Sequence, residues 1–495
     1  MLTVLIVIGI VLIGAIGVWS RTRQTSLSGW SVGKRDLPRW TTWFLQAGES
    51  LTTFSFLGLA GLAYGGGMAA LYAVGYLTIT CTLQYFILPR QRQLGANRGY
   101  LTMADFFQDR FGSRALGKTV ALCGAIFLLP YLQLQITGLG MIVQLATGSA
   151  DASGFSMIVA SVLVVVFVIW AGLRGIARVA VFKDFMMVAA LVIVIAGVIA
   201  SVGAIPDVVA KVNAISGDFF TISRPGFDAK FWVTSVAVTG LGAGFNTFPH
   251  LWPPTLAAKS GKILRQNNSW IAIYQLSLFI PIMVGLAGIL VLPAHTKGNT
   301  VLLSVAQHSL PEPLLAVIAI GGAAAAMVPA GAIAMGISML VSNNLFSIKN
   351  PRLRFRVNHL VVAVAVALAL VFGLAKSDIG ALLLLTYGGL TQMVPAVAFG
   401  LARKVKVHGI PVTLGILAGT LSVGVITFAN ISTGGIDSGL LSLVPNLVVL
   451  AVAEGIRRVA FKGQPPVPAH ADESATGPRL SADHGRETVT EGATA

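Results

Sequence analysis

The stretch TTWFLQAGESLTTFSFLGLAGLAYG at residues 41–65 decides the fold. It is long and apolar enough to cross a membrane, but it carries Gln46, Glu49 and a run of hydroxyl side chains in front of several glycines. The stretch FWVTSVAVTGLGAGFNTFPHLWPPT at residues 231–255 is similar, with glycines, prolines and Asn246 inside an apolar segment. Two such interrupted helices point to a binding site near the middle of the bilayer, between two inverted repeats.

The composition is that of a polytopic helical membrane protein. The mean hydropathy is +0.82, 55% of the residues are hydrophobic and 11% are charged. A lipid-exposed backbone must satisfy its own hydrogen bonds, which favours helices. With roughly 20 apolar residues needed per crossing, we predict an all-α fold with about 13 transmembrane helices, at residues 2–19, 41–64, 67–89, 116–147, 155–173, 179–203, 230–256, 269–293, 314–347, 357–375, 378–401, 408–428 and 439–456.

The spacing of the two interrupted helices predicts an internal repeat. Five spans lie between residues 41 and 203 and five between 230 and 401, and an odd number of spans gives the two repeats opposite topology. One helix precedes the repeats and two follow them. We expect the membrane domain to cover residues 1–461, and the polar segment 462–495 to be a disordered cytoplasmic tail.

The basic residues predict the orientation. With the N-terminus outside, 29 of the 34 lysines and arginines fall in inner loops or in the tail, as is typical of cytoplasmic loops. We therefore expect a multi-pass protein of the plasma membrane with a cytoplasmic C-terminus. Contact with anionic lipid accounts for the net charge of +16, without nucleic acid as a partner. The outer side keeps Lys211, Arg224, Lys230, Lys297 and Lys376.

Several short motifs, spread over residues 28–252, resemble those of a known family. They are SGWSVGKRDLPRW at 28–40, FLGLAGLAY at 56–64, LTMADFFQDRFGS at 101–113, YLQLQITGLG at 131–140 and FPHLW at 248–252. Their order and spacing are similar to those of the sodium:solute symporter family. The resemblance implies a leucine-transporter-type 5+5 inverted repeat with one extra N-terminal and two extra C-terminal helices. The interrupted helices indicate the same architecture.

Three stretches are most similar to the monocarboxylate permease branch of that family. They are TWFLQAGESLTTFSF at 42–56, GLRGIARVAVFKDF at 172–185 and MVPAGAIAMGISMLVSNNLF at 327–346. This resemblance implies transport of pyruvate, lactate, a short fatty acid or alanine.

The ninth span departs from the pattern of sodium-coupled members. Those members usually carry a Ser-Thr or Ser-Ser pair after an Ala-Met, and the hydroxyls complete the sodium site of this fold. In this sequence Val328 and Pro329 stand there, and their side chains offer no oxygen to a hard cation. Backbone carbonyls freed by Pro329 partly compensate. The resemblance thus leaves open a sodium site near Gly48, Leu51, Ala325, Val328 and Pro329.

Two acidic residues are candidates for ion coupling. Glu49 lies well inside the second span, where a carboxylate indicates function by default, either by carrying a proton or by binding a cation. The alternative is a structural hydrogen bond to Gln46 or a neighbouring helix. Asp184 lies near the inner end of the sixth span, where the resemblance implies a cytoplasmic ion route. The alternative is an interfacial pair with Lys183, or a carboxylate stabilised by a helix dipole.

Polar side chains at the helix breaks are candidates for binding the solute. Hydroxyls and free N–H groups at the start of a half-helix suit a carboxylate, although hydroxyls also bond back to the helix. The glutamines of the fourth span need hydrogen-bond partners, which are either the solute or a neighbouring helix. His250 either titrates near neutral pH or only forms a structural hydrogen bond. The predicted substrate-binding residues are Ser50, Thr52, Thr53, Ser55, Tyr131, Gln133, Gln135, Asn246 and His250.

No other chemistry is indicated. The sequence has no Gly-x-x-x-x-Gly-Lys-Ser/Thr string, so ATP-driven transport is not predicted. No cysteine and histidine cluster or nucleophile arrangement suggests an enzyme, a cofactor or a catalytic metal. Glu454 precedes Arg457 and Arg458 by three and four residues, which predicts ion pairs within one helix.

We therefore predict a secondary active symporter that imports a small organic solute, with a monocarboxylate as the first choice, by alternating access. Its partners are the solute, the lipid bilayer and a coupling ion, which is H⁺ or Na⁺. Three alternatives stay open. They are a sodium-coupled symporter for an amino acid such as proline, a sugar or another solute; a channel; and a membrane sensor, which the absence of a signalling domain in the sequence disfavours.

Overall fold

The computed structural model describes residues 2–19, 29–30, 32–33, 35–147, 153–222, 228–375 and 379–461, apart from a few side chains that include Glu49 and Ser50. Over these residues the chain is helical, and its β-structure is one parallel bridge between Leu37 and Ala258. The predicted all-α fold is confirmed. The predicted tail at 462–495 lies outside the described residues.

Each predicted span coincides with one helix, with part of α8, or with a consecutive set of helices. By length and composition, eight helices of the described ranges can cross a membrane, or nine if the bent pair α17 and α18 is one span. The exact number of spans stays a prediction. The helices are α1 Leu2–Trp19, α3 Arg39–Ser50, η1 Phe54–Gly58, α4 Leu59–Gly66, η2 Gly67–Leu71, α5 Tyr72–Arg98, α6 Met103–Phe111, α7 Arg114–Thr147, α8 Ser153–Ser201, α9 Ile205–Ile215, η3 Gly217–Phe220, α10 Ala229–Gly244, η4 Pro249–Leu251, α11 Trp252–Ala257, α12 Gly261–Tyr274, η5 Gln275–Leu278, α13 Phe279–Val291, η6 Gly298–Thr300, α14 Val301–Ser309, α15 Glu312–Met339, η7 Leu340–Leu345, α16 Pro351–Ala375, α17 Ile379–Thr391, α18 Val394–Leu401, α19 Gly409–Phe428 and α20 Ser438–Ala460.

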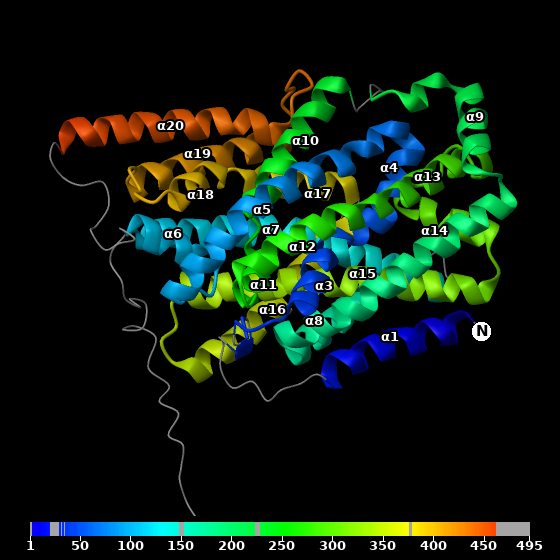
Figure 1. Cartoon of the computed structure of the whole chain (residues 1–495), viewed down its shortest axis with the longest axis horizontal. Coiled ribbons are helices and arrows are strands. Elements are labelled where there is room, and N and C mark those ends of the chain that lie inside the picture. The colour runs from blue at the N-terminus through cyan, green and yellow to red at the C-terminus, as the bar shows by residue number, and fades with distance from the viewer. Residues whose placement is uncertain are drawn as a thin grey trace, which may run out of the picture.

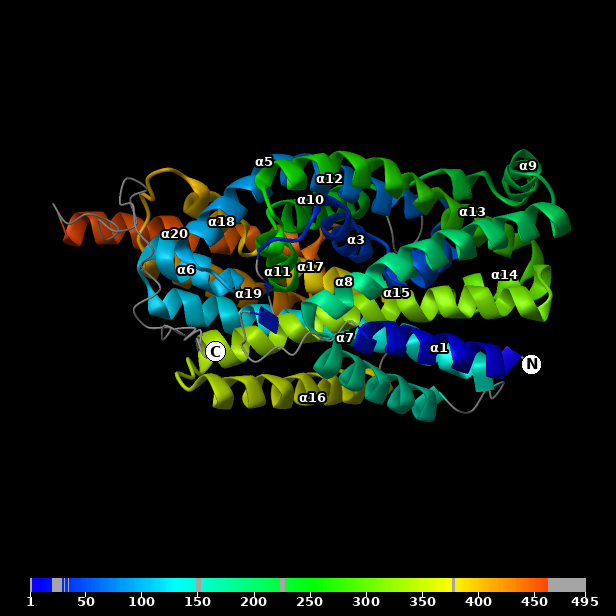
Figure 2. The ribbon, with the colours of Figure 1, turned by 60° about the horizontal axis from the view of Figure 1, so that its bottom comes forward.

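The long helices lie side by side along the long axis of the molecule (Figure 1). Helix α15 packs against α7, α8, α1 and α16, and nearly all of its side chains are buried. Its many alanines and glycines permit close helix packing. Helix α1 lies along α8 and α15, with α16 nearby (Figure 2). Helices α19 and α20 pack together at another edge of the bundle.

Two helices are broken where the sequence predicts interruptions. Helix α3 ends at Ser50, and the chain leaves the helical path before it continues into η1 and α4. Helix α10 ends at Gly244, and Asn246 then takes a φ of 56° before η4 and α11. Asparagine is one of the few residues other than glycine that adopt this left-handed conformation at low cost. Both breaks therefore follow from residues visible in the sequence.

The connection between the fifth and sixth predicted spans differs from the expectation. Residues 174–178 were expected as a loop between spans 155–173 and 179–203, but they are helical. Helix α8 is interrupted at Gly172 alone, where φ is 55° and ψ is −175°. A glycine adopts this conformation without steric cost, so one residue near the end of the predicted span 155–173 changes the direction of the chain in place of the predicted loop.

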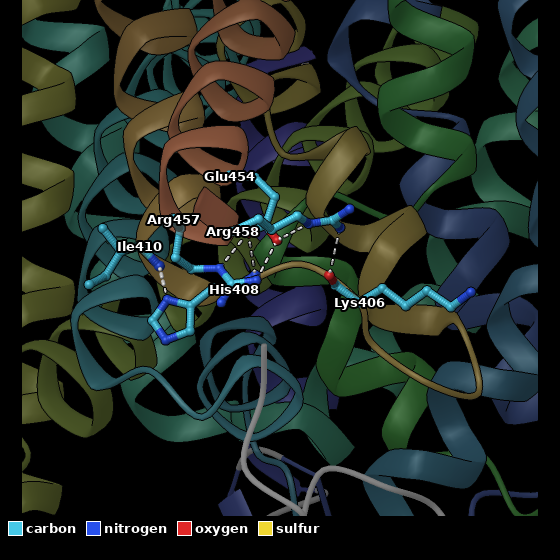
Figure 3. A network of polar contacts seen from close by, with 6 residues as sticks. All are labelled: Lys406, His408, Ile410, Glu454, Arg457 and Arg458. Carbon is cyan, nitrogen blue, oxygen red and sulfur yellow. Dashed lines mark hydrogen bonds and ion pairs between the residues drawn. The ribbon is translucent and has the colours of Figure 1, made fainter. Parts of the chain in front are cut away.

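Ion pairs predicted in the last helix are confirmed (Figure 3). Oε1 of Glu454 lies 2.7 Å from Arg457 and 2.8 Å from Arg458. The same carboxylate accepts the backbone N–H of His408 at 3.2 Å, and Arg458 donates to the carbonyl of Lys406 at 3.3 Å. The network thus ties α20 to the segment between α18 and α19, and serves structure rather than transport.

The tight joint between α4 and η2 gives a test of the fold. Gly67 has φ 59° and ψ −131°, and a side chain there would collide with the backbone carbonyl of Phe219. We expect Gly67→Ala to lower the free energy of unfolding by about 1–3 kcal/mol, the usual cost of such backbone strain. Gly65→Ala is the matched control, because open space surrounds Gly65. Melting temperatures of the purified variants in detergent measure the effect, and equal values would contradict the assigned joint.

Candidate functional site

A cavity of about 60 Å³ lies between the two broken helices. Residues from α3, α5, α7, α12, η5 and α17 line it, together with residues from the end of α10, the break after it, and α11. A space of this size holds a few water molecules or a small solute. Among the described residues no Asp, Glu, Lys or Arg lines it. Its polar side chains are Gln46, Thr80, Cys81, Gln84, Tyr131, Asn246, His250, Thr255, Gln275 and Tyr387.

Glutamines of α5 support the break after α10. A helix end leaves carbonyls without intrahelical partners, and lipid cannot supply donors to them. Gln84 donates to the carbonyl of Ala243 at 2.9 Å, and Gln91 donates to the carbonyl of Phe245 at 3.2 Å. The amide of Asn246 donates to Oε1 of Gln91 at 2.8 Å. The break is therefore held by side chains that lie more than 150 residues earlier in the chain.

The backbone of Asn246 is fixed from the other side as well. The indole of Trp252 donates to the carbonyl of Asn246 at 2.8 Å. Both residues are fully buried, with an exposed fraction of 0%. Gly336 of α15 lets this segment pack closely, because a side chain there would approach the Cα of His250 to 2.9 Å. The segment that carries Asn246 and His250 is thus rigidly placed.

Helix α7 supports the break after α3. The backbone N–H of Thr53 donates to Oε1 of Gln135 at 3.4 Å, and both residues are buried. Gly138, one turn further along α7, leaves the space that the Thr53 side chain occupies. Gln135 therefore caps the start of the second half-helix.

A series of aromatic rings borders the cavity on one side. Tyr131 and His250 have ring centroids 5.5 Å apart, and Phe248 lies 4.6 Å from Tyr387. Tyr387 is in turn 5.7 Å from Tyr76, which lies near the start of α5 and outside the cavity. The rings lead from the cavity wall towards the end of the bundle where α5 begins.

A buried ion pair lies beside the first break. Nζ of Lys183 lies 2.9 Å from Oδ1 of Asp184 and donates to the carbonyl of Gly48 at 2.7 Å. Tyr274 of α12 donates to Oδ1 of Asp184 at 3.3 Å. The exposed fraction is 0% for the Lys183 side chain and 3% for that of Asp184. The pair predicted as one alternative for Asp184 is therefore present, but it is buried rather than interfacial.

The predicted substrate-binding residues separate into three groups. Tyr131, Asn246 and His250 line the cavity. The side chains of Ser50 and of the predicted coupling residue Glu49 lie outside the described residues. The others are buried, but they do not line the cavity; they are Thr52, Thr53, Ser55, Gln133 and Gln135.

Sequence reasoning missed several polar residues of the wall, above all Gln84 and Gln275. Each is a lone glutamine in an apolar span, and a lone buried amide needs a partner, so the signal was present. Nε2 of Gln275 is buried and has no hydrogen-bond partner among the described residues. Its Oε1 accepts from the Cys81 thiol at 3.7 Å. The Gln275 amide therefore keeps a donor available at the cavity.

Comparison with known proteins relates this architecture to a family of transporters. A family model described as "Sodium:solute symporter family" matches residues 30–401. An uncharacterized symporter, YhjB, of Bacillus subtilis is 29% identical over 462 residues, with 88% of this chain and 93% of the relative covered. A monocarboxylate transport permease protein of Rhizobium johnstonii is 26% identical over 86% of this chain and 90% of its own length.

Other similarities concern sodium-coupled proteins. A sodium/proline symporter of Staphylococcus aureus is 24% identical over 59% of this chain and 57% of its own length. The solved structure of a Na⁺-coupled sialic acid symporter, bound to its substrate in an outward-open state, superposes with a TM-score of 0.76. It is 16% identical and covers 93% of this chain and 98% of its own chain. At this identity the likeness concerns the fold, and it supports the leucine-transporter-type architecture.

Gln91 tests the support of the second break. Gln91→Leu leaves the carbonyl of Phe245 and the amide of Asn246 without their partner. We expect a loss of about 1–3 kcal/mol of stability per unsatisfied buried group, with a lower melting temperature and weaker transport. Gln93→Leu is the matched control, since Gln93 lies on the same helix and is exposed. If both variants behave alike, Gln91 does not hold the break.

Proposed function

The chain belongs to the sodium:solute symporter family, and on that premise we propose that it imports a small monocarboxylate together with a cation. Members of this family and the structural neighbours are transporters, not enzymes. The chain is accordingly a multi-pass membrane protein and a cation-coupled symporter of a small solute. The choice of a monocarboxylate, the plasma membrane and a cytoplasmic C-terminus are parts of the proposal.

The observation that carries the proposal is the polar but uncharged wall of the cavity. A buried carboxylate needs hydrogen-bond donors, and the amide of Gln275 has a donor there that no described residue accepts. Asn246 and His250 add polar groups from the broken helix. An amino acid would also bring an ammonium group, and no carboxylate among the described wall residues would pair with it. A solute with one carboxylate therefore suits this wall better than a zwitterion.

The proposed mechanism is alternating access. The rings from Tyr76 through Tyr387 to Phe248 close the cavity towards the end that the basic residues predict to be outside. Rocking of the repeats would open this side and close the other. The coupling ion is H⁺ or Na⁺, and Glu49 and Asp184 remain the proposed coupling residues. The family name and the sialic acid neighbour favour Na⁺, whereas Val328 and Pro329 favour H⁺.

A second candidate is a sodium-coupled symporter for proline or another solute. The relative from Staphylococcus aureus, a sodium/proline symporter, supports it. Sodium stimulation of uptake at fixed pH and competition by proline would distinguish this function from the first.

Uptake into proteoliposomes tests the substrate and the ion together. Labelled pyruvate and lactate are offered under a proton gradient or a sodium gradient, each imposed alone. We expect accumulation under at least one gradient, and a loss of proton-driven accumulation in Glu49→Gln if that carboxyl carries the proton. Absence of uptake under both gradients would contradict the monocarboxylate assignment.

Gln275 tests recognition of the carboxylate. Gln275→Leu removes the available amide donor at the cavity, and we expect KM for the monocarboxylate to rise roughly ten- to a hundredfold, since a hydrogen bond to a charged group contributes about 1.5–3 kcal/mol. Gln266→Leu on the preceding helix, α12, is the matched control, because Gln266 does not line the cavity. An unchanged KM in Gln275→Leu would remove this residue from the binding site.

A further inference from the structure

The position between α3 and α8 is built around a positive charge. The Lys183 side chain is completely buried, and its ammonium group is bonded to the Gly48 carbonyl at 2.7 Å and paired with Asp184 at 2.9 Å. An ammonium group has three donors and no acceptor, and a buried charge is tolerated only when it is paired and hydrogen-bonded. The carbonyl and the carboxylate provide these partners. Gly48 is in the last turn of α3, where its carbonyl has no intrahelical partner.

This is the position at which the sequence leaves open a sodium site. A Cβ atom at Gly48 would lie 3.5 Å from the ammonium nitrogen and 3.7 Å from the side chain of Val328. Gly48 and Val328, two of the residues named for that site, are therefore neighbours, and the ammonium group lies next to them. The segments expected to form the site lie together, and the ammonium group of Lys183 lies beside Gly48.

The remaining groups there do not suit a sodium ion. A hard cation takes several oxygen ligands, by analogy with Ca²⁺ and Mg²⁺. The carbonyl of Gly48 already accepts from Lys183, and the side chains of Ala325, Val328 and Pro329 contain no oxygen. Pro329 has no N–H to donate to the carbonyl of Ala325, which leaves that backbone oxygen and the carbonyl oxygen of Leu51. Two oxygens are too few for a cation that takes several oxygen ligands.

We propose that the ammonium group of Lys183 is the resident cation of this position, and that the chain transports its solute without sodium. The inference rests on the proposed function only in so far as the chain is a cation-coupled carrier. The ammonium group has the unit charge of Na⁺ and uses the same kinds of oxygen partner. Because it is covalently attached, it holds α3 against α8 but cannot cross the membrane.

The groups around the ammonium are few. The charged partner is Asp184, and Tyr274 of α12 donates to that carboxylate. From α3 the contact is the Gly48 carbonyl, and the apolar Val328 of α15 lies beside Gly48. The Lys183–Asp184 pair is neutral as a whole, and the side chain of Glu49, the residue after Gly48, lies outside the described residues.

The first experiment needs no substrate. The melting temperature of the purified full-length protein is compared in sodium chloride, potassium chloride and choline chloride at equal ionic strength and pH. A ligand that binds the folded state raises its stability with concentration. We expect the same melting temperature in all three salts. A saturable rise specific to sodium would overturn the inference, whatever solute the protein carries.

The second experiment uses uptake. Initial rates of pyruvate or lactate uptake are measured with sodium and with choline on both sides, under the same proton gradient. We expect equal rates for the wild type, and a fall of roughly tenfold or more in Lys183→Met in both salts, as for loss of one partner of a buried pair. Lys118→Met, at an exposed lysine, is the matched control. Dependence of the wild type on sodium, or full activity of Lys183→Met, would overturn the inference.

The two experiments separate the possible failures. If neither acid is taken up under any gradient, the monocarboxylate assignment fails, but the melting temperatures still decide whether sodium binds. If Lys183→Met does not fold, as judged by gel filtration, the wild-type response to sodium decides alone. Sodium-independent melting together with sodium-independent uptake supports the resident ammonium.

Discussion

Every backbone N–H and C=O group inside a bilayer must find its partner within the protein, and the whole site depends on how this is achieved at two helix breaks. A break is useful because it places free polar groups at membrane depth, but each free group is costly unless it is bonded. The chain satisfies some of them with side chains and leaves a small polar cavity between the breaks. Gln84 and Gln91 bond the end of α10, Gln135 bonds the start of the half-helix after α3, and Lys183 bonds the Gly48 carbonyl.

The same constraint explains how far the sequence predicts the structure. The breaks themselves were predictable, because glycines, prolines and polar residues inside an apolar segment are visible locally. Their partners were not, because Gln91 and Phe245 are 154 residues apart and Lys183 and Gly48 are 135 residues apart. The interruption of helix α8, unlike the two breaks, could not be predicted from the sequence. Its turn depends on the conformation of Gly172, and glycine adopts so many conformations that the sequence does not reveal which is used.

Only part of the candidate site could be predicted from the sequence, and the reason is again the need of buried polar groups for partners. A polar residue in an apolar span needs a partner, but the sequence does not distinguish a solute from a neighbouring backbone group. Gln135 was assigned to the solute, and its amide oxygen instead accepts from Thr53. Gln275 was overlooked, and its amide lines the cavity with a donor that has no partner within the described ranges of the chain. Only the three-dimensional arrangement of α5, α7 and the broken helices separates these two roles.

Charge movement limits what a resident ammonium group can do. Import of one anion against an inside-negative potential costs about 2.3 kcal/mol per 100 mV, unless a cation crosses with it. Lys183 is attached to α8, so its charge does not cross the membrane and cannot offset this cost. A mobile cation must still accompany a monocarboxylate, and a proton is the coupling ion that needs no shell of oxygen ligands. The Lys183 ammonium group therefore does not replace the mobile coupling ion, but it restricts which ion can couple to transport.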